Sequence, residues 1–341
     1  MTLWLVRCGR RGEGESYAMS NTVVGVGWAE LGDISKAHSI DAVRQRIEER
    51  HPDAKPSTVA NWAGQVDAFT NRIKDGDLVA LPLKSAPAVA FGRITGGYRF
   101  DASAPDQIRH QRPVKWIRED VPRSEIDQDL LYSLGAFMTV CQIKRNNAEE
   151  RIEALLAGKP TAEPVVAPEV PSDEGEEAAP VDFDRLSRDQ IGKRIAARFH
   201  GHELAQLVGE ILRAEGFVTN VSPAGPDGGV DILAGQGSMG FDGAMLAVQV
   251  KSGAQQADAP TLRELQGVMS NFGATRGLLV SWGGFTKSAR AEARRLFFQI
   301  RLWDSDALVD KITEVYERLP GETQAELPLR RIWTLVPEDT D

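Results

Sequence analysis

The sequence predicts an α/β protein, with a mixed sheet and flanking helices in its second half, preceded by a small α+β β-barrel domain. Three observations carry this prediction. Short apolar runs typical of strands dominate the first 150 residues, strand and helix patterns alternate after residue 200, and a stretch rich in Pro, Ala and Glu lies between the two parts. The length of 341 residues fits two domains of ordinary size.

The first part, residues 1–151, consists mainly of predicted strands. Helical patterns occur only at residues 37–50 and 57–73. The strand-like runs are LWLVR, TVVGVGW, DLVALPL, AVAFGRITG and PVKWI. Several short strands with few helices favour a small β-barrel on which the helices pack.

An acidic linker is predicted over residues 152–184. Its middle, residues 158–181, reads GKPTAEPVVAPEVPSDEGEEAAPV, without apolar periodicity or aromatic residues. Such a composition cannot bury a core. The linker carries −8 of the formal net charge of −9, so the two folded parts are close to neutral. The acidic total therefore does not exclude DNA as a partner, because binding needs only a local basic patch.

The second part, residues 185–320, opens with two helical patterns. Residues 182–200 are rich in Arg and Lys, and Arg194 and Arg198 are the candidates for phosphate contacts, although a solvated helix face explains them equally well. The run GHELAQLVGEILRAEGF that follows places its apolar residues on one helical stripe, which Gly216 ends.

Strands and helices then alternate to the end of this part. The predicted strands are 217–221, 229–234, 244–251, 277–281 and 300–303, and the predicted helices are 260–271, 286–298 and 305–318. Residues 321–341 form a C-terminal tail. Its run PLRRIWTLV adds an edge strand or docks on the first part, and the sequence leaves both alternatives open.

Three residues in the second part point to chemistry. Asp231 ends the run GGVD, while Gln249 and Lys251 lie two apart in the strand-like run AMLAVQVK. Side chains alternate along a strand, so Gln249 and Lys251 share one face, and pairing of the two runs brings Asp231 to that face. A carboxylate, an amide and a lysine that converge in this way can hold a divalent metal and activate a water for phosphodiester cleavage.

These residues resemble the PD-(D/E)xK nuclease core, in the variant with Gln found in Mrr-like restriction endonucleases. The pieces that carry the resemblance are GGVD at 228–231, QVK at 249–251 and SWGGFT at 281–286. The resemblance covers roughly residues 200–312. It implies a restriction-endonuclease-like mixed sheet with flanking helices, and an Mg²⁺-dependent DNA endonuclease.

Each of the three residues has an expected role. Asp231 and the carbonyl of Val250 hold one weakly bound Mg²⁺, for which Mn²⁺ is a substitute, together with waters and DNA phosphate. Gln249 adds no charge to this site. The Lys251 cation stabilises charge that develops on the attacked phosphate and helps to lower the pKa of the attacking water.

Further candidates surround this core. Asp227 lies in a Pro-Asp-Gly-Gly turn, which by itself explains an Asp there. The resemblance also implies a helix glutamate, whose position falls on Ala205 in this sequence. Glu203 and Glu210 border the same apolar stripe, and we favour Glu203.

Two hydroxyl groups flank the Trp-Gly-Gly-Phe turn. Ser281 and Thr286 are candidates for phosphate contacts, or alternatively for capping the helix that follows, and Thr286 is the better candidate for the N-cap.

The first part resembles the PUA/EVE-like barrels. Those domains are themselves similar to readers of modified bases in nucleic acids. GVGW at 25–28, GDLVALP at 76–82, FGRITG at 91–96 and the pattern HxRxVxW at 110–116 carry this weaker resemblance. It implies a PUA/EVE-like β-barrel domain that reads a modified base.

A pocket for a flipped base needs aromatic faces. Trp4, Trp28, Trp62 and Trp116 are candidates, although each Trp taken alone fits a core as well. The polar segment 9–21 is expected to contact DNA, and its candidate residues are Arg10, Arg11 and Tyr17.

Other classes of protein find no support in the sequence. No run approaches the ~20 apolar residues that span a membrane, and two isolated cysteines, Cys8 and Cys141, favour a cytoplasmic protein. The run GQGSMG at 235–240 matches a dinucleotide fingerprint but leads into a strand, so we expect a hairpin and no nucleotide cofactor.

The sequence thus predicts a modification-dependent, type IV-like restriction endonuclease. Its partner is double-stranded DNA that carries a modified base, and it acts as a homodimer because one such site cuts one strand. Two alternatives stay open. One is a nucleic-acid-binding module with a weak or inactive nuclease fold, and the other is a structure-selective repair nuclease.

Overall fold

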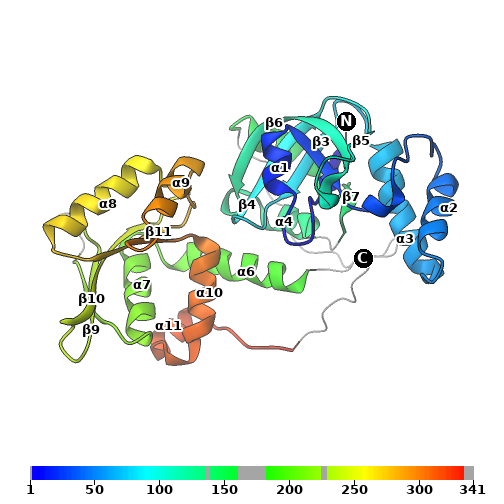
Figure 1. Cartoon of the computed structure of the whole chain (residues 1–341). Coiled ribbons are helices and arrows are strands. Elements are labelled where there is room, and N and C mark those ends of the chain that lie inside the picture. The colour runs from blue at the N-terminus through cyan, green and yellow to red at the C-terminus, as the bar shows by residue number, and fades with distance from the viewer. Residues whose placement is uncertain (1, 136–137, 160–181, 224–228, 334–341) are drawn as a thin grey trace. The chain divides into compact units, whose positions relative to one another are not determined.

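A computed structural model describes residues 2–135, 138–159, 182–223 and 229–333 of the chain. The chain divides into two compact units, whose described residues lie within 2–186 and 187–333. Figure 1 shows the helices and strands of both units, and each unit is considered by itself.

A seven-stranded mixed sheet forms the first unit. The order is β2-β6-β4-β3-β1-β7, and the short β5 pairs with β6. β1 and β3 run parallel, whereas the other pairs are antiparallel. The strands are β1 (Leu3–Val6), β2 (Val23–Val26), β3 (Leu78–Pro82), β4 (Ala88–Ile94), β5 (Arg99–Phe100), β6 (His110–Pro122) and β7 (Val140–Ile143).

Helices cover this sheet and its connections. The α-helices are α1 (Glu15–Ser20), α2 (Ile40–Arg50), α3 (Pro56–Asp67), α4 (Gln128–Leu134) and α5 (Ala148–Leu156). A π-helical turn, η2 (Ala68–Arg72), continues α3, and three 3₁₀ turns complete the set: η1 (Ala29–Leu31), η3 (Asp106–Ile108) and η4 (Arg123–Glu125).

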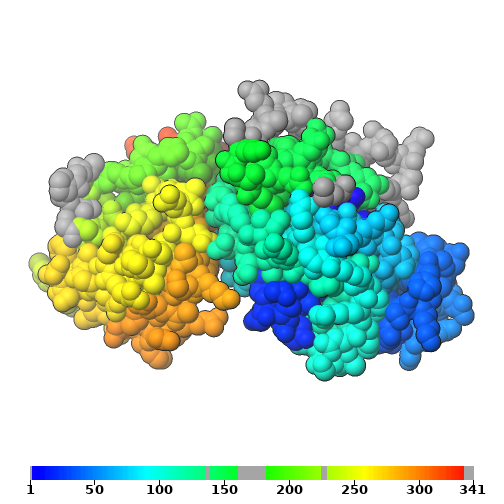
Figure 2. Space-filling view, turned by 90° about the horizontal axis from the view of Figure 1, so that it is seen from above, coloured from blue at the N-terminus to red at the C-terminus, as the bar shows by residue number. Residues whose placement is uncertain are grey.

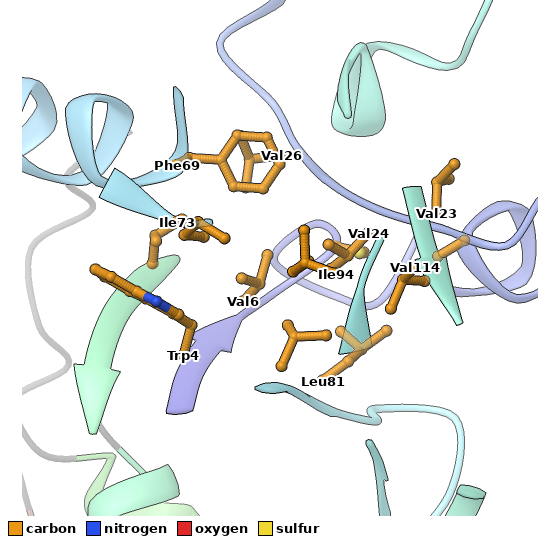
Figure 3. Packing of buried hydrophobic residues seen from close by; sticks show 14 of the residues in the cluster. Trp4, Val6, Val23, Val24, Val26, Phe69, Ile73, Leu81, Ile94 and Val114 are labelled. Carbon is orange, nitrogen blue, oxygen red and sulfur yellow. The ribbon is translucent and has the colours of Figure 1, made fainter. Parts of the chain in front are cut away.

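Alternation along β1 divides the core of the first unit in two. Trp4 and Val6 face a core that β2 and η2 also enter, which Figure 3 shows from close by. Leu3 and Leu5 face a second core, which α4 and α5 cover. The outermost strands of the sheet, β2 and β7, both contribute to the first core, so the sheet curves around it. Among the described residues no strand pairing joins β2 to β7.

The second unit is a five-stranded mixed sheet between two layers of helices. Its order is β12-β11-β10-β9-β8, with β8, β9 and β10 antiparallel and β10, β11 and β12 parallel. The strands are β8 (Val218–Val221), β9 (Ile232–Gln236), β10 (Asp242–Lys251), β11 (Arg276–Ser281) and β12 (Ile300–Trp303). The helices are α6 (Phe183–Arg198), whose first four residues belong to the first unit, α7 (His202–Ala214), α8 (Ala259–Asn271), α9 (Lys287–Arg295), α10 (Ser305–Val315) and α11 (Gly321–Glu326), with a 3₁₀ turn η5 (Tyr316–Arg318).

Each face of this sheet has its own core. Val248 and Val280 face α7 and α10, while Ala247 and Leu279 face α8 and α9. Figure 2 shows α8 (yellow) and α9 (orange) side by side on the surface, where Arg263 and Glu292 join them by an ion pair of 2.7 Å. The sheet is therefore covered on both sides, as its near-continuous apolar strands require.

Three helices of the second unit begin at a side-chain cap. Asp258, Thr286 and Asp304 each accept a hydrogen bond from the backbone N–H three residues further on, at the start of α8, α9 and α10. Such caps satisfy donors that have no partner within the helix. They explain why these helices start within one residue of the starts that the sequence predicts.

The predicted fold class is confirmed: the structure is a mixed α/β protein with a β-rich first unit. Several elements were not predicted from the sequence. α1 occupies part of the expected polar loop, and α4, α5, β5 and β7 were missed. None of the helices described is long and apolar enough to cross a membrane.

Two boundaries of the expected domains are corrected. α5 extends to Leu156 and buries Ile152 completely, so folded structure continues past residue 151 into the expected linker. α11 forms within the expected tail, and Leu327, just after it, is buried in the second unit. The described residues of the tail, which end at Trp333, form no strand. Residues 160–181 of the expected linker lie outside the described residues.

Candidate active site

Asp231 is hydrogen-bonded to β10 through both its backbone and its side chain. β9 and β10 pair antiparallel, with Ile232 opposite Val248. One residue earlier, the Asp231 amide donates to the Val248 carbonyl at 3.0 Å. Its carboxylate accepts a hydrogen bond from the Val250 amide, with 2.7 Å between Oδ2 and N. The Asp231 carboxylate thus takes the place of a backbone carbonyl as the hydrogen-bond acceptor for the Val250 amide, and it lies beside Val250.

The backbone carbonyl of Val250 points to the same side of β10 as the Asp231 carboxylate. In a strand the N–H and C=O of one residue point to the same neighbouring strand. Since the Val250 amide meets Asp231, its carbonyl also faces the side of Asp231. A carboxylate oxygen and a backbone carbonyl are therefore available together.

Gln249 contributes a buried amide. Its side chain is only 6% exposed and lies on the face of Ala247, towards the layer of α8 and α9. Its Oε1 has no hydrogen-bond partner among the described residues. A buried acceptor without a donor costs about 1–3 kcal/mol, which a bound cation would offset.

Lys251 ends β10 on the same face as Gln249, and its side chain is exposed. Its carbonyl accepts a hydrogen bond from Trp282 at 2.8 Å, so the end of β10 is tied to the turn after β11. The ammonium group therefore stands at the edge of the sheet where solvent and a phosphate can reach it.

The two glutamates of α7 differ in position. Glu203 lies in the first turn, and its carboxylate accepts from the His200 amide at 3.1 Å. Gly201, the residue before α7, donates to the Ser252 hydroxyl at 3.2 Å, so this end of α7 lies beside the residue that follows Lys251. Glu210 lies further along α7 and accepts from Thr323 of α11. Of the two, Glu203 is therefore the one at the end of α7 that approaches the site, although its side chain is exposed.

The expectation for Ser281 is corrected. Ser281 pairs with Lys251 in the sheet, but its side chain is 0% exposed, so its hydroxyl cannot meet a phosphate as placed. Its Oγ has no partner among the described residues. Thr286 acts as the N-cap of α9, with 3.2 Å between its Oγ1 and the Ala289 nitrogen.

The oxygen atoms at this edge are suited to a hard cation. Asp231, the Val250 carbonyl and the unpaired Gln249 Oε1 are the ligand types that Mg²⁺ and Mn²⁺ accept. In the described part of the chain no group of three or more His, Cys, Asp or Glu side chains could hold a metal. Asp227 lies outside the described residues. Asp231 is a carboxylate that the structure places at this edge beside Val250, and a site with few charged ligands is expected to bind Mg²⁺ weakly.

The two candidate arginines on α6 differ in their hydrogen bonding and exposure. Arg194 donates from Nε to the Glu326 carbonyl at 2.9 Å and so holds the end of α11. Arg198 is exposed. Of the two, Arg198 is the better placed for a phosphate contact.

Two of the four tryptophans considered for a base pocket are core residues. Trp4 is buried, and its Nε1 donates to Asp77 at 3.0 Å. Trp62 of α3 is buried in the cluster that α3 forms with α2. Trp28 and Trp116 are half-buried against the first core.

Trp28 has an unusual backbone and an unusual partner. Its φ of 56° places it in the left-handed region, which is rare for a bulky residue and is associated with functional sites. The Trp28 carbonyl lies 2.9 Å from His110 Nε2, and the Tyr98 hydroxyl lies 2.8 Å from Nδ1. Burial lowers the pKa of His110, so the neutral ring donates from Nε2 and accepts at Nδ1.

The segment 9–21 is anchored at its middle. Arg10 and Arg11 are exposed, whereas the Tyr17 hydroxyl donates to Asp101 at 3.3 Å. Glu15, which was not singled out from the sequence, is buried and accepts from the Lys84 amide at 2.6 Å and the Ser85 hydroxyl at 2.7 Å. A buried carboxylate of this kind has no local sequence signal, because its partners lie far along the chain.

Comparisons with known proteins bear on both units. Residues 196–312 match a protein family described as restriction endonuclease, and residues 4–143 match a domain of unknown function. No curated protein matches the chain. The second unit is therefore a restriction endonuclease domain. Within that class, residues 196–312 belong to the Mrr catalytic family, as the sequence predicted. The PUA/EVE-like assignment of the first unit stays a prediction.

Three solved structures show distant likenesses. A protein of unknown function, AF1548, is 16% identical over 36% of this chain and 77% of its own, with a TM-score of 0.26. The DNA modification-dependent restriction endonuclease AspBHI is 16% identical over 74% of this chain and 67% of its own, with a TM-score of 0.35. The MspJI restriction endonuclease, in complex with a 27-mer oligonucleotide, is 13% identical over 96% of this chain and 80% of its own, with a TM-score of 0.31. Scores this low carry no conclusion about the activity of this chain.

Proposed function

We propose that this protein is a divalent-metal-dependent DNA endonuclease that cuts DNA carrying a modified base. The observation that carries the proposal is the junction of β9 and β10, where the Asp231 carboxylate lies beside Val250 and the unpaired Gln249 amide, within a restriction endonuclease domain. These oxygens favour Mg²⁺, with Mn²⁺ as a substitute.

The proposed roles follow from position. Asp231, the Val250 carbonyl and Gln249 hold the metal, which when bound polarises a phosphate oxygen and lowers the pKa of a water. Lys251 stands at the exposed end of β10 and stabilises the charge that develops on the attacked phosphate. Glu203 lies at the neighbouring end of α7, where it can orient the attacking water.

The first unit is proposed to select the DNA. Phosphates are the same in every duplex, so the metal site cannot by itself discriminate marked from unmarked DNA. Arg10 and Arg11 are exposed on the segment that Glu15 anchors, and the half-buried Trp28 offers an aromatic face. A pocket for a flipped base can sense the added volume and the altered edge of a modified base.

Two copies are proposed to act together. One site of this kind cuts one strand, so a double-strand break requires a second site, and a homodimer supplies it.

Plasmid cleavage tests the proposal. Supercoiled plasmid containing methylcytosine or hydroxymethylcytosine, and an unmodified plasmid of the same sequence, are incubated with the protein and Mg²⁺ or with EDTA. We expect cutting of a marked plasmid alone, and only with the metal. Binding without cutting of any plasmid would favour the inactive binding module, and equal cutting of all plasmids would favour the repair nuclease.

A further inference from the structure

An apolar cavity lies at the end of the second unit's sheet opposite to Lys251. It measures about 270 Å³, and its walls come from the last turn of α7 and the first residues of β10 and β11. Leu212, Leu246 and Leu278 line it, together with Phe297 and Phe298 from the turn before β12. Phe298 is 81% exposed, which is unusual for a large apolar side chain without a partner surface.

The cavity carries positive charge. Arg276 and Arg301 line it, and the Arg301 guanidinium lies 3.8 Å from the centre of the Phe297 ring. The acidic residue in its wall, Glu215, pairs with Lys311 of α10, with 3.0 Å between Nζ and Oε1, and Lys311 also pairs with Glu314 at 2.8 Å. The cavity therefore suits a segment that is apolar and negatively charged.

The hairpin between β9 and β10 has this character. Its tip exposes Met239 (72%) and Phe241 (78%), and Asp242 follows them at the start of β10. Gly237 and Gly240 both have a φ of 80°, a backbone conformation that glycine adopts readily in tight turns. Neither Met239 nor Phe241 lines the cavity of its own domain.

We propose that the occupant of the cavity is the hairpin tip of a second copy of this chain. The tip is apolar and acidic, and the cavity is apolar and basic, so the two surfaces are complementary. They are also neighbours, because Ala244 in the cavity wall follows the tip by only a few residues. A twofold axis between two copies therefore makes both tip-to-cavity contacts at once.

This interface leaves the catalytic edges free. The cavity and Lys251 lie at opposite ends of β10, so pairing through the cavity covers neither candidate active site. The proposed dimer is argued from the tip and cavity surfaces alone. It is therefore independent of whether the candidate active site cleaves DNA.

The association of the full chain tests the inference. Sedimentation velocity over a concentration series is expected to show a dimer for the natural protein. Phe241→Lys places a cation against the basic cavity, and Phe298→Glu places an anion against the acidic tip, so each is expected to weaken association at least ~10-fold. Both side chains are exposed, so the fold is retained. Ile117→Glu, on an exposed position of β6 in the first unit, is the matched control and keeps the dimer.

Mixing the two variants gives a sharper readout. A chain with Phe241→Lys keeps an intact cavity, and one with Phe298→Glu keeps an intact tip. We expect their mixture to form a heterodimer through one remaining contact, although neither variant pairs well with itself. A natural protein that stays monomeric up to about 100 μM would overturn the inference. A dimer that neither variant weakens would overturn it as well.

Discussion

Gln249 distinguishes this site from one built of two carboxylates. Its buried Oε1 has no partner among the described residues, and the Asp231 carboxylate lies on the neighbouring strand, bonded to the Val250 amide. A neutral amide adds a ligand without adding charge, so the proposed site is expected to bind its metal weakly.

Changing Gln249 to Glu should tighten metal binding. Gln249→Glu adds a carboxylate next to Asp231, so the Mg²⁺ concentration that supports half-maximal cleavage is expected to fall by roughly 10-fold. A titration of cleavage rate against Mg²⁺ measures this, with Gln249→Ala as the variant that needs more metal. An unchanged Mg²⁺ requirement in both variants would show that Gln249 does not bind the metal.

Ser281 should be dispensable. Its hydroxyl is fully buried and lacks a partner among the described residues, and replacing an unsatisfied buried group with an apolar one is nearly neutral or stabilising. We expect Ser281→Ala to keep its cleavage rate, and its free energy of unfolding to change by less than about 1 kcal/mol. A large loss of cleavage in a stably folded variant would show that the hydroxyl has a chemical role.

At the scale of elements, Glu15 joins α1 to the hairpin between β3 and β4. Its buried carboxylate accepts from the amides of Lys84 and Ser85 and from the Ser85 hydroxyl. Glu15→Ala leaves these donors unsatisfied and should lower the free energy of unfolding of the first unit by about 1–3 kcal/mol. Denaturant unfolding measures the loss, and Glu48→Ala on the exposed face of α2 is the control. Equal stability of the two variants would mean that the anchor is not needed.

The elements also show where sequence reasoning works and where it stops. Alternation in AMLAVQVK was enough to place Gln249 and Lys251 on one face and Asp231 beside them, because strand pairing is a local, periodic signal. The contact of Gly201 with Ser252 and the anchor of Glu15 depend on residues that lie 51 and 69 or more positions apart. No local pattern specifies such contacts.

At the scale of the whole molecule, the first unit ends later than its composition suggests. Arg151 of α5 bonds to Asp127 at 2.7 Å and to Asp129, and Ile152 is fully buried. A fragment of residues 1–150 loses these contacts, whereas one of residues 1–159 keeps them.

The two fragments should therefore differ in stability. We expect the fragment 1–159 to exceed 1–150 in free energy of unfolding by about 3 kcal/mol or more, since burial of Ile152 and the paired Arg151 both contribute. Denaturant unfolding of the two fragments measures the difference. Equal stability would place the end of the folded part before α5.

The central claim is that the edge formed by Asp231 and Lys251 is a nuclease site. Single-turnover cleavage of a marked duplex with Mg²⁺, measured together with binding of the same duplex at one salt concentration, tests it most directly. Asp231→Ala and Lys251→Ala are each expected to lower the cleavage rate by at least ~100-fold while binding stays within about 3-fold, and the exposed Lys36→Ala is the control. Cleavage by either variant at the rate of the natural protein would contradict the account.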